Sequence, residues 1–154
     1  MNSVDAAWVA GIIEGEGTIH IVKTEGKPRI AVGMTDEDVV RALHQKTGVG
    51  YVYGPYDKDN WGNKEFYQWI VQKREDVRSI INEILPFLYS RRTLQALVCL
   101  DAMDELDRKA EFRKKFCKLG HNREEVGTNS RGDCLPCVEI WNSNRRQRYH
   151  EKVS

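Results

Sequence analysis

One stretch, VAGIIEGEG at residues 9–17, places small residues and two acids on a helix and its end. The small residues let a second helix approach closely. Gly15 and Gly17 free the backbone around Glu16, so its carboxylate can project from the helix end. The helix dipole repels a carboxylate there, and a bound divalent cation would remove the conflict. This stretch is therefore the first candidate for a metal site.

Phosphodiester hydrolysis is the chemistry that would use such a carboxylate. A hard cation lowers the pKa of a water, screens charge on the leaving oxygen, and takes one or two carboxylates plus waters as ligands. If two copies of the helix packed side by side, their Glu16 carboxylates would meet near a twofold axis, each facing one strand of a duplex. The alternative is an ordinary helix end with a solvated acid.

The flanking sequence predicts an α+β domain with the order αββαββα. Apolar residues at helical spacing predict helices, and alternating apolar residues predict strands. The expected elements are a helix that Ser3 caps and that Gly15 and Gly17 stop, strands 18–24 and 29–34 joined by a turn at 25–28, a helix starting at 35–38, strands 49–56 and 64–72 joined by a loop at 57–63, a helix over 77–88 that Pro86 ends or kinks, and a helix over 93–112.

Two of these elements carry specific expectations for the core. In the last strand, Tyr67, Trp69 and Val71 share one face because side chains alternate along a strand. The last helix is expected to turn its aliphatic residues inward. These residues are Leu94, Leu97, Val98, Leu100 and Met103.

Residues 8–19 resemble the LAGLIDADG motif of homing endonucleases, with Glu14 and Glu16 in its two acidic positions. Further matches fall at residues 48–52 and 86–88, and the overall pattern agrees to about residue 107. The resemblance implies a saddle-shaped antiparallel sheet that straddles DNA in the major groove. Because the chain has a single motif, it also implies a homodimer formed through the Val9–Gly17 helix.

By the same resemblance, Glu16 binds catalytic Mg²⁺ and the Gly15 carbonyl is a possible second ligand. Glu14 matches the position used at the interface or helix end. Asp36 falls where the family keeps a polar residue that organises water, and Arg91 falls where it keeps a basic residue, usually lysine, near the scissile phosphate. Arginine in place of lysine is a departure from that pattern. Its guanidinium can stabilise negative charge on the phosphate, but its very high pKa makes it a poor proton donor.

A DNA-reading face follows from strand alternation, starting at Glu16. Arg29 and Gln68 are suited to guanine and adenine edges, and Lys27 to phosphate. For each residue the alternative is an exposed strand position that contacts nothing. The predicted DNA-binding residues of the sheet are Thr18, His20, Thr24, Lys27, Arg29, Tyr53, Gln68 and Ile70.

Charge divides the chain into an acidic part and a basic part. Residues 1–107 carry 12 basic against 17 acidic side chains, a net charge of −5, whereas residues 108–154 carry 12 against 6, a net charge of +6. A basic tail of this kind suits a polyanion, although it would also keep any short tail solvated. We therefore expect an endonuclease domain at 1–112 and a basic module at 113–154.

The basic module contains a set of metal ligands. Cys117, His121, Cys134 and Cys137 supply three thiolates and an imidazole at the spacing of a structural zinc site, with free thiols or a redox pair as the alternative. After them a helix is expected to lay Arg145, Arg146 and Arg148 along DNA phosphates. Solvated charge or a protein contact is the other interpretation of those arginines.

These features predict a site-specific double-strand DNA endonuclease, of the kind that moves introns or inteins, cutting a long near-palindromic target with Mg²⁺. Two alternatives remain: a non-cleaving DNA- or RNA-binding regulator or intron maturase on the same fold, and a zinc-organised protein-interaction module. No run of about 18 apolar residues and no secretory signal occur. We therefore expect no membrane partner and an intracellular location, in the cytoplasm or nucleoid, an organelle or a phage-infected host.

Overall fold

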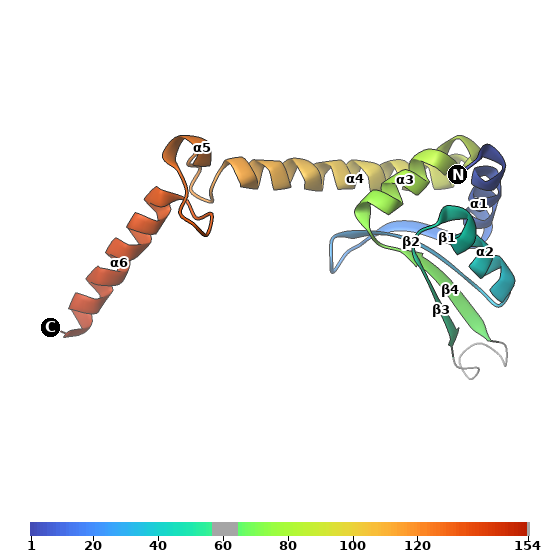
Figure 1. The fold of residues 1–154 in the computed structure, drawn as a ribbon, viewed down its shortest axis with the longest axis horizontal. Coiled ribbons are helices and arrows are strands. Elements are labelled where there is room, and N and C mark those ends of the chain that lie inside the picture. The colour runs from blue at the N-terminus through green and yellow to red at the C-terminus, as the bar shows by residue number, and fades with distance from the viewer. Residues whose placement is uncertain (57–64, 154) are drawn as a thin grey trace. The chain divides into compact units, whose positions relative to one another are not determined.

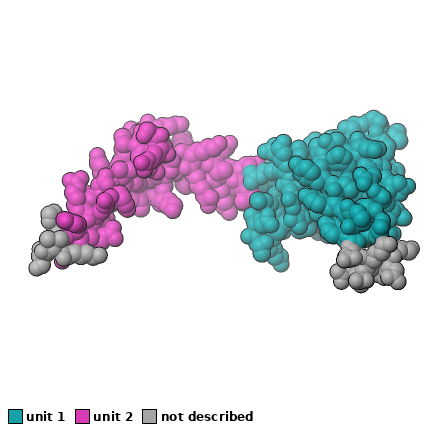
Figure 2. Space-filling view, turned by 60° about the horizontal axis from the view of Figure 1, so that its bottom comes forward, with its two compact units in different colours: residues 1–104 teal, residues 105–154 magenta. Residues whose placement is uncertain are grey.

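A computed structural model describes residues 1–56 and 65–153, so the expected loop at 57–63 and the strand start at Lys64 lie outside the described residues. The chain divides into two compact units, Met1–Asp104 and Glu105–Ser154 (Figure 2). In order, the elements are α1 (Ser3–Glu16), β1 (Gly17–Val22), β2 (Lys27–Met34), α2 (Glu37–Thr47), β3 (Tyr51–Tyr56), β4 (Phe66–Val71), α3 (Arg74–Ile84), the 3-10 turn η2 (Leu85–Phe87), α4 (Ser90–Lys115), α5 (Arg123–Val126) and α6 (Leu135–Val153) (Figure 1).

The first unit is a four-stranded antiparallel sheet in the order β1-β2-β4-β3, with α1, α2 and α3 on one of its faces (Figure 1). The predicted α+β class and the αββαββα order are confirmed. Tyr67, Trp69 and Val71 are buried, as the alternation predicts, and the Trp69 indole N–H donates to the Val49 carbonyl at 3.0 Å. Among the described residues, no helix of this unit covers the opposite face of the sheet, where Thr18 and His20 are exposed.

Both ends of α1 differ from the prediction. Asn2 rather than Ser3 is the cap, since its side-chain oxygen accepts from the Asp5 N–H at 2.8 Å. At the other end the helix continues through Gly15 to Glu16, and Gly17 closes it by donating its N–H to the Ile13 carbonyl. Glycine lowers helix stability by roughly 1 kcal/mol but does not terminate a helix whose buried face is packed.

The turn between β1 and β2 lies earlier than predicted. It occupies residues 23–26, so β2 already begins at Lys27. Thr24 consequently lies in the turn and not on the strand face to which the sequence assigned it. Pro86 ends regular helix as predicted, because α3 stops at Ile84 and passes into the 3-10 turn.

Helix α4 is rotated relative to the prediction. Leu94, Leu97 and Val98 are 64%, 47% and 60% exposed, so the expectation that they pack inward is wrong for these three residues. Arg92, Ala96, Cys99 and Met103 form the buried face instead. Burial of Arg92 depends on a contact with α1, and a hydrophobic pattern cannot anticipate a buried guanidinium.

No described helix combines the length and the apolar character needed to cross a lipid bilayer.

The loop between α2 and β3 provides a test of the fold. Gly48 and Gly50 both have positive φ, at 69° and 81°. A Cβ at Gly48 would meet nothing within 4 Å, whereas one at Gly50 would lie 2.7 Å from the Ile70 carbonyl oxygen. We expect Gly48→Ala to lower the free energy of unfolding by about 1 kcal/mol. Gly50→Ala should lower it by ~1–3 kcal/mol more than Gly48→Ala does, because the added Cβ also meets the Ile70 carbonyl. Urea unfolding of the two variants measures the difference, and equal losses would contradict this account of the loop.

Candidate metal and nucleic-acid sites

Glu16 is the last residue of α1, at the point where the helix passes directly into β1. A Cβ at the next residue, Gly17, would lie 2.6 Å from the Ile13 Cα, so only glycine lets the strand leave the helix this closely. Glu16 is exposed. Within residues 1–56 and 65–153 its carboxylate has no hydrogen bond or ion pair, and it is therefore free to take a ligand.

Glu14, two residues earlier, is engaged within the unit. Its carboxylate accepts from the Tyr89 N–H at 2.7 Å. Its backbone carbonyl accepts from the guanidinium groups of Arg91 at 3.4 Å and Arg92 at 3.5 Å. These contacts, which we call the Glu14 clamp, join the end of α1 to the start of α4. They also place two cations at a helix C-terminus, where the helix dipole favours positive charge.

Arg92 is the buried member of the clamp, with 6% of its surface exposed. Desolvation and the neighbouring charge of Arg91 lower the pKa of Arg92, while the Glu14 carboxylate opposes that shift. Its Nη1 donates to the Gln95 side chain at 2.8 Å, and its Nε has no partner within the described part of the chain. The family resemblance assigned the active-site role to Arg91, and nothing in the sequence of the two adjacent arginines indicates which of them is buried.

Asp36 lies at the same end of the sheet as Glu16. Gly17 pairs with Val32 at the start of β1, and β2 ends two residues later at Met34. Asp36 then occupies the N-cap position of α2, but its side chain makes no capping hydrogen bond. This exposed carboxylate, like that of Glu16, is therefore not used by the secondary structure that carries it.

The uncovered face of the sheet, which we call the outer face, carries most of the predicted DNA-binding residues. Cross-strand pairing aligns Thr18 with Ala31, His20 with Arg29, Ile70 with both Ala31 and Tyr51, and Gln68 with both Gly33 and Tyr53. The burial pattern alternates along β1 and β4 and sets these residues opposite the core-facing ones. The register therefore brings Thr18, His20, Arg29, Tyr53, Gln68 and Ile70 onto one surface.

The remaining predicted sheet residues are less available. Lys27 is exposed but pairs with Glu25 at 3.3 Å, and Thr24 lies in the turn. Phe66 also lies on the outer face, where its ring occupies the space above Gly33, 2.5 Å from where a Cβ on that glycine would lie. Tyr51, 72% exposed beside Tyr53, was missed by the sequence reasoning, although its two-residue spacing from Tyr53 was a usable signal.

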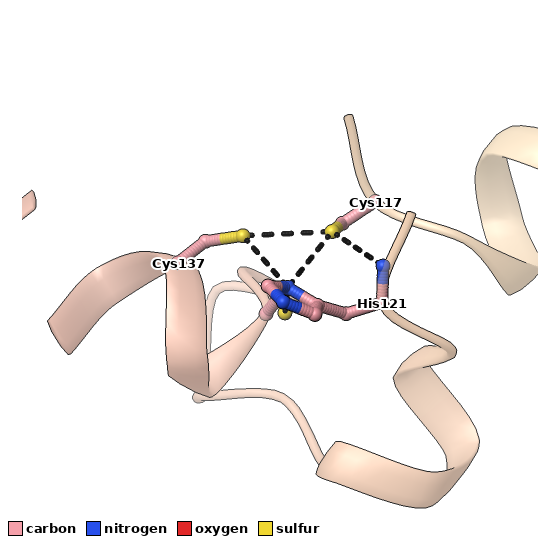
Figure 3. Close-up of side chains that lie close together, drawn as sticks. Cys117, His121 and Cys137 are labelled. Atoms are coloured by element: carbon pink, nitrogen blue, oxygen red, sulfur yellow. Dashed lines mark hydrogen bonds between the residues drawn. The ribbon is translucent and has the colours of Figure 1, made fainter. Parts of the chain in front are cut away.

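The four predicted metal ligands of the second unit converge. The ligand atoms of Cys117, His121, Cys134 and Cys137 all lie within 4.8 Å of one another. The His121 Nδ1 is 3.5, 3.6 and 3.4 Å from the sulfurs of Cys117, Cys134 and Cys137 respectively, and the first and last of these sulfurs are 3.5 Å apart (Figure 3). In a tetrahedral zinc site with Zn–S bonds of about 2.3 Å, neighbouring sulfurs lie about 3.8 Å apart. The donor set and its spacing therefore fit a tetrahedral metal.

The local backbone holds these ligands in place. The Cys117 N–H donates to the His121 carbonyl at 3.0 Å, and the Gly120 N–H returns to the Cys117 carbonyl at 3.0 Å. A second turn forms around Asn129, whose side-chain oxygen accepts from the N–H groups of Arg131 and Asp133, each at 2.9 Å. Cys134 ends that turn and Cys137 follows within the first turn of α6. Two short turns and a helix start thus present the ligands.

The cysteine pKa values reflect the crowding of sulfurs. Burial would raise the pKa of Cys117, but hydrogen bonds from Cys137 and from backbone N–H groups outweigh it and lower that pKa to about 6. Burial and hydrogen bonding to the Cys117 sulfur raise the pKa of Cys137 to about 12. Neighbouring thiolates repel one another without a cation between them, and a bound metal would stabilise all three as thiolates.

Helix α6 carries an exposed basic and aromatic surface. Arg145, Arg146 and Arg148 are all exposed, and none forms an ion pair with a described residue. The Arg145 guanidinium lies 5.5 Å from the centre of the Trp141 ring, which is itself 56% exposed. Such a surface has the charge and the flat aromatic group that suit a polyanion.

Comparison with solved structures identifies the fold of the first unit. I-CvuI, a homing endonuclease solved in complex with its target in the presence of Ca, superposes with a TM-score of 0.55 at 17% identity over 70% of this chain and 71% of that one. The homing endonuclease I-TnaI gives 0.55 at 19% identity over 71% and 78%. The LAGLIDADG homing endonuclease I-SmaMI, bound to cleaved DNA, gives 0.51 at 15% identity over 68% and 37%.

No family model and no curated protein matches the sequence. At identities of 15–19%, the structural matches show a shared fold.

Proposed function

We propose that this chain, whose core has the LAGLIDADG homing endonuclease fold, is a homodimeric, Mg²⁺-dependent endonuclease that cuts both strands of a specific, long, near-palindromic DNA target. One observation carries the proposal. The carboxylate of Glu16, which has no partner among the described residues, lies where α1 passes into β1. The outer face of the sheet that begins there is lined with residues able to contact bases. The complex of I-CvuI with its target supports DNA as the ligand of such a face.

In this proposal each residue of the active site has a separate role. The Glu16 carboxylate and the Gly15 carbonyl supply oxygen ligands, which are those that Mg²⁺ prefers, and leave room for water and a phosphate oxygen. Bound Mg²⁺ would lower the pKa of a water and screen the leaving oxygen. Asp36 orients the attacking water. Arg91 would stabilise negative charge on the phosphate through the fork of N–H donors on its guanidinium.

The dimer would form through the face of α1 that points away from the core. Val9, Ala10 and Ile13 are buried within the unit, whereas Gly11 and Gly15 are exposed, and a Cβ on either glycine would meet nothing within 4 Å. Glycine inside a helix is destabilising relative to alanine, so neither glycine is explained by packing within one subunit. A second α1 crossing at close range would explain both.

The second unit would hold structural zinc and extend the DNA contact. The thiolate and imidazole set of Cys117, His121, Cys134 and Cys137 is typical of closed zinc sites. Arg145, Arg146 and Arg148 on α6 would then bind phosphates beside the sequence read by the sheet. This contact adds affinity and salt dependence without adding sequence preference.

Replacing the metal-binding acid tests the catalytic assignment. We expect Glu16→Gln to lower the rate of DNA cleavage by at least about 10³-fold, because a neutral amide holds Mg²⁺ poorly, while DNA binding in Ca²⁺ stays within about threefold. The substrate is a duplex that the wild-type protein selects from a randomised library in Ca²⁺. Glu75→Gln, an exposed change on α3, is the matched control and should cut normally. Binding without cleavage by the wild-type protein would instead favour a non-cleaving regulator.

The dimer surface is tested by adding bulk to α1. Gly11→Leu should leave the subunit folded, because the added side chain points into open space, but should weaken dimerisation by at least about tenfold by blocking the close helix crossing. Analytical ultracentrifugation measures the dissociation constant, and circular dichroism reports the fold. Ala110→Leu, which adds similar bulk at an exposed position of α4, should leave the dimer intact. A Gly11→Leu variant that dimerises like the wild type would rule out this surface.

Zinc content tests the second unit. The purified chain should contain one zinc ion, and Cys134→Ser should lose it, whereas Cys99→Ala should retain it because the Cys99 thiol is buried in the core of the first unit. Chelation should make residues 117–150 sensitive to protease and leave the sheet unit resistant, since the metal supplies most of the order in that segment. Elemental analysis and mapped limited proteolysis give the two readouts. A digestion pattern that chelation does not alter would contradict a structural role.

A further inference from the structure

The end of β4 places the amide of Gln72 beside Arg29 on the outer face. Gln72 directly follows β4, and Arg29 lies on the neighbouring strand β2, where Ile30 pairs with Val71. The hydrogen-bonding groups of the Gln72 amide find matching partners when its oxygen faces the guanidinium. That oxygen then accepts from the Arg29 Nε at 2.9 Å and from the Arg29 Nη2. Arg29 is half-buried and Gln72 is exposed. The pair therefore sits on the surface that the proposed function assigns to DNA.

We propose that Gln72 is a positioning residue that holds Arg29 toward the major-groove edge of a guanine, so that Arg29 fixes that base of the target. The inference rests on the proposed function and deepens it, since it assigns a base class to one position of the DNA site. Arginine is well suited to this contact because its planar donors match the O6 and N7 acceptors of guanine.

Donor accounting supports the orientation. A guanidinium has five N–H donors, and Gln72 occupies the Nε–H and one on Nη2. The donors that remain lie on the two terminal nitrogens, which are the ones that reach a base edge in a fork-shaped contact. Holding the long side chain in place before binding also reduces the conformational entropy lost on binding. Gln72 thus leaves the terminal end of the Arg29 guanidinium available to contact a base.

The neutral charge of Gln72 matters for DNA binding as much as its position beside Arg29 does. An acidic partner would accept the same hydrogen bonds but would neutralise the guanidinium and compete with DNA. Glutamine orients Arg29 and leaves its full positive charge in place. No described acid forms an ion pair with Arg29, and its cross-strand neighbour on β1 is His20. The site therefore keeps its attraction for the electronegative guanine edge.

The outer face also supplies an internal control. Gln68 lies on β4, four residues before Gln72, and pairs with Gly33 and Tyr53. At about 3.3 Å per residue the two glutamines are ~13 Å apart, roughly the length of four stacked base pairs. A change at Arg29 should therefore alter the preference at one position of each half-site and leave the position contacted from Gln68 unchanged.

The test is selection from a library of randomised DNA duplexes by the full-length protein in Ca²⁺, followed by sequencing. The wild-type protein should enrich guanine at one position of each half-site by about tenfold or more, and Arg29→Ala should abolish that preference while keeping the others. Gln72→Ala should reduce the guanine preference severalfold. Gln72→Glu should preserve it, because the acceptor remains, but should lower overall affinity by about threefold or more because Arg29 is neutralised.

The outcomes separate the two levels of the proposal. Two results would overturn the inference while leaving the proposed function standing. In the first, Arg29→Ala selects a sequence with the same base preferences as the wild type. In the second, Gln72→Ala does so. A wild-type protein that enriches no sequence would refute the proposed function itself. Circular dichroism and thermal unfolding of each variant, all altered on the outer face, verify that the differences arise in a folded protein.

Discussion

The Glu14 clamp is the contact on which the geometry of the first unit depends. The carboxylate holds the Tyr89 N–H, and the carbonyl meets the guanidinium groups of Arg91 and Arg92. These bonds place positive charge at the C-terminus of α1, where the helix dipole favours it, and hold that terminus against the start of α4. Because β1 continues from α1 through Gly17, the clamp also determines where Glu16 stands at the edge of the sheet.

The clamp explains why α1 and α4 bury the faces that they do. Helix α1 packs Val9 and Ile13 against the sheet and leaves Gly11 outward, so one helix serves both the core and an open surface. Helix α4 must turn Arg92 inward to reach the Glu14 carbonyl, which rotates Leu94 and Val98 to the outside. The same orientation of α4 buries Ala96, Cys99 and Met103 beside Arg92.

The second unit is organised on a different principle. Few of its apolar side chains are buried, and Leu119, Ile140 and Trp141 are all about half exposed or more. Two short turns and the start of α6 converge instead on three sulfurs and an imidazole. In a segment too short and polar to form a hydrophobic core, a metal site would supply the missing stabilisation. The first unit, by contrast, has a continuous apolar core built from its sheet and helices.

The sequence by itself determined the order of elements, the faces taken by most strand residues, and the grouping of the four Cys and His ligands, because those follow from local spacing and from alternation. It could not determine the partner of Glu14, the rotation of α4 or the pairing of Gln72 with Arg29. Those contacts join residues far apart in the chain, up to 78 positions for Glu14 and Arg92. Only the tertiary structure decides them, because a guanidinium is buried or oriented by whatever the fold brings beside it.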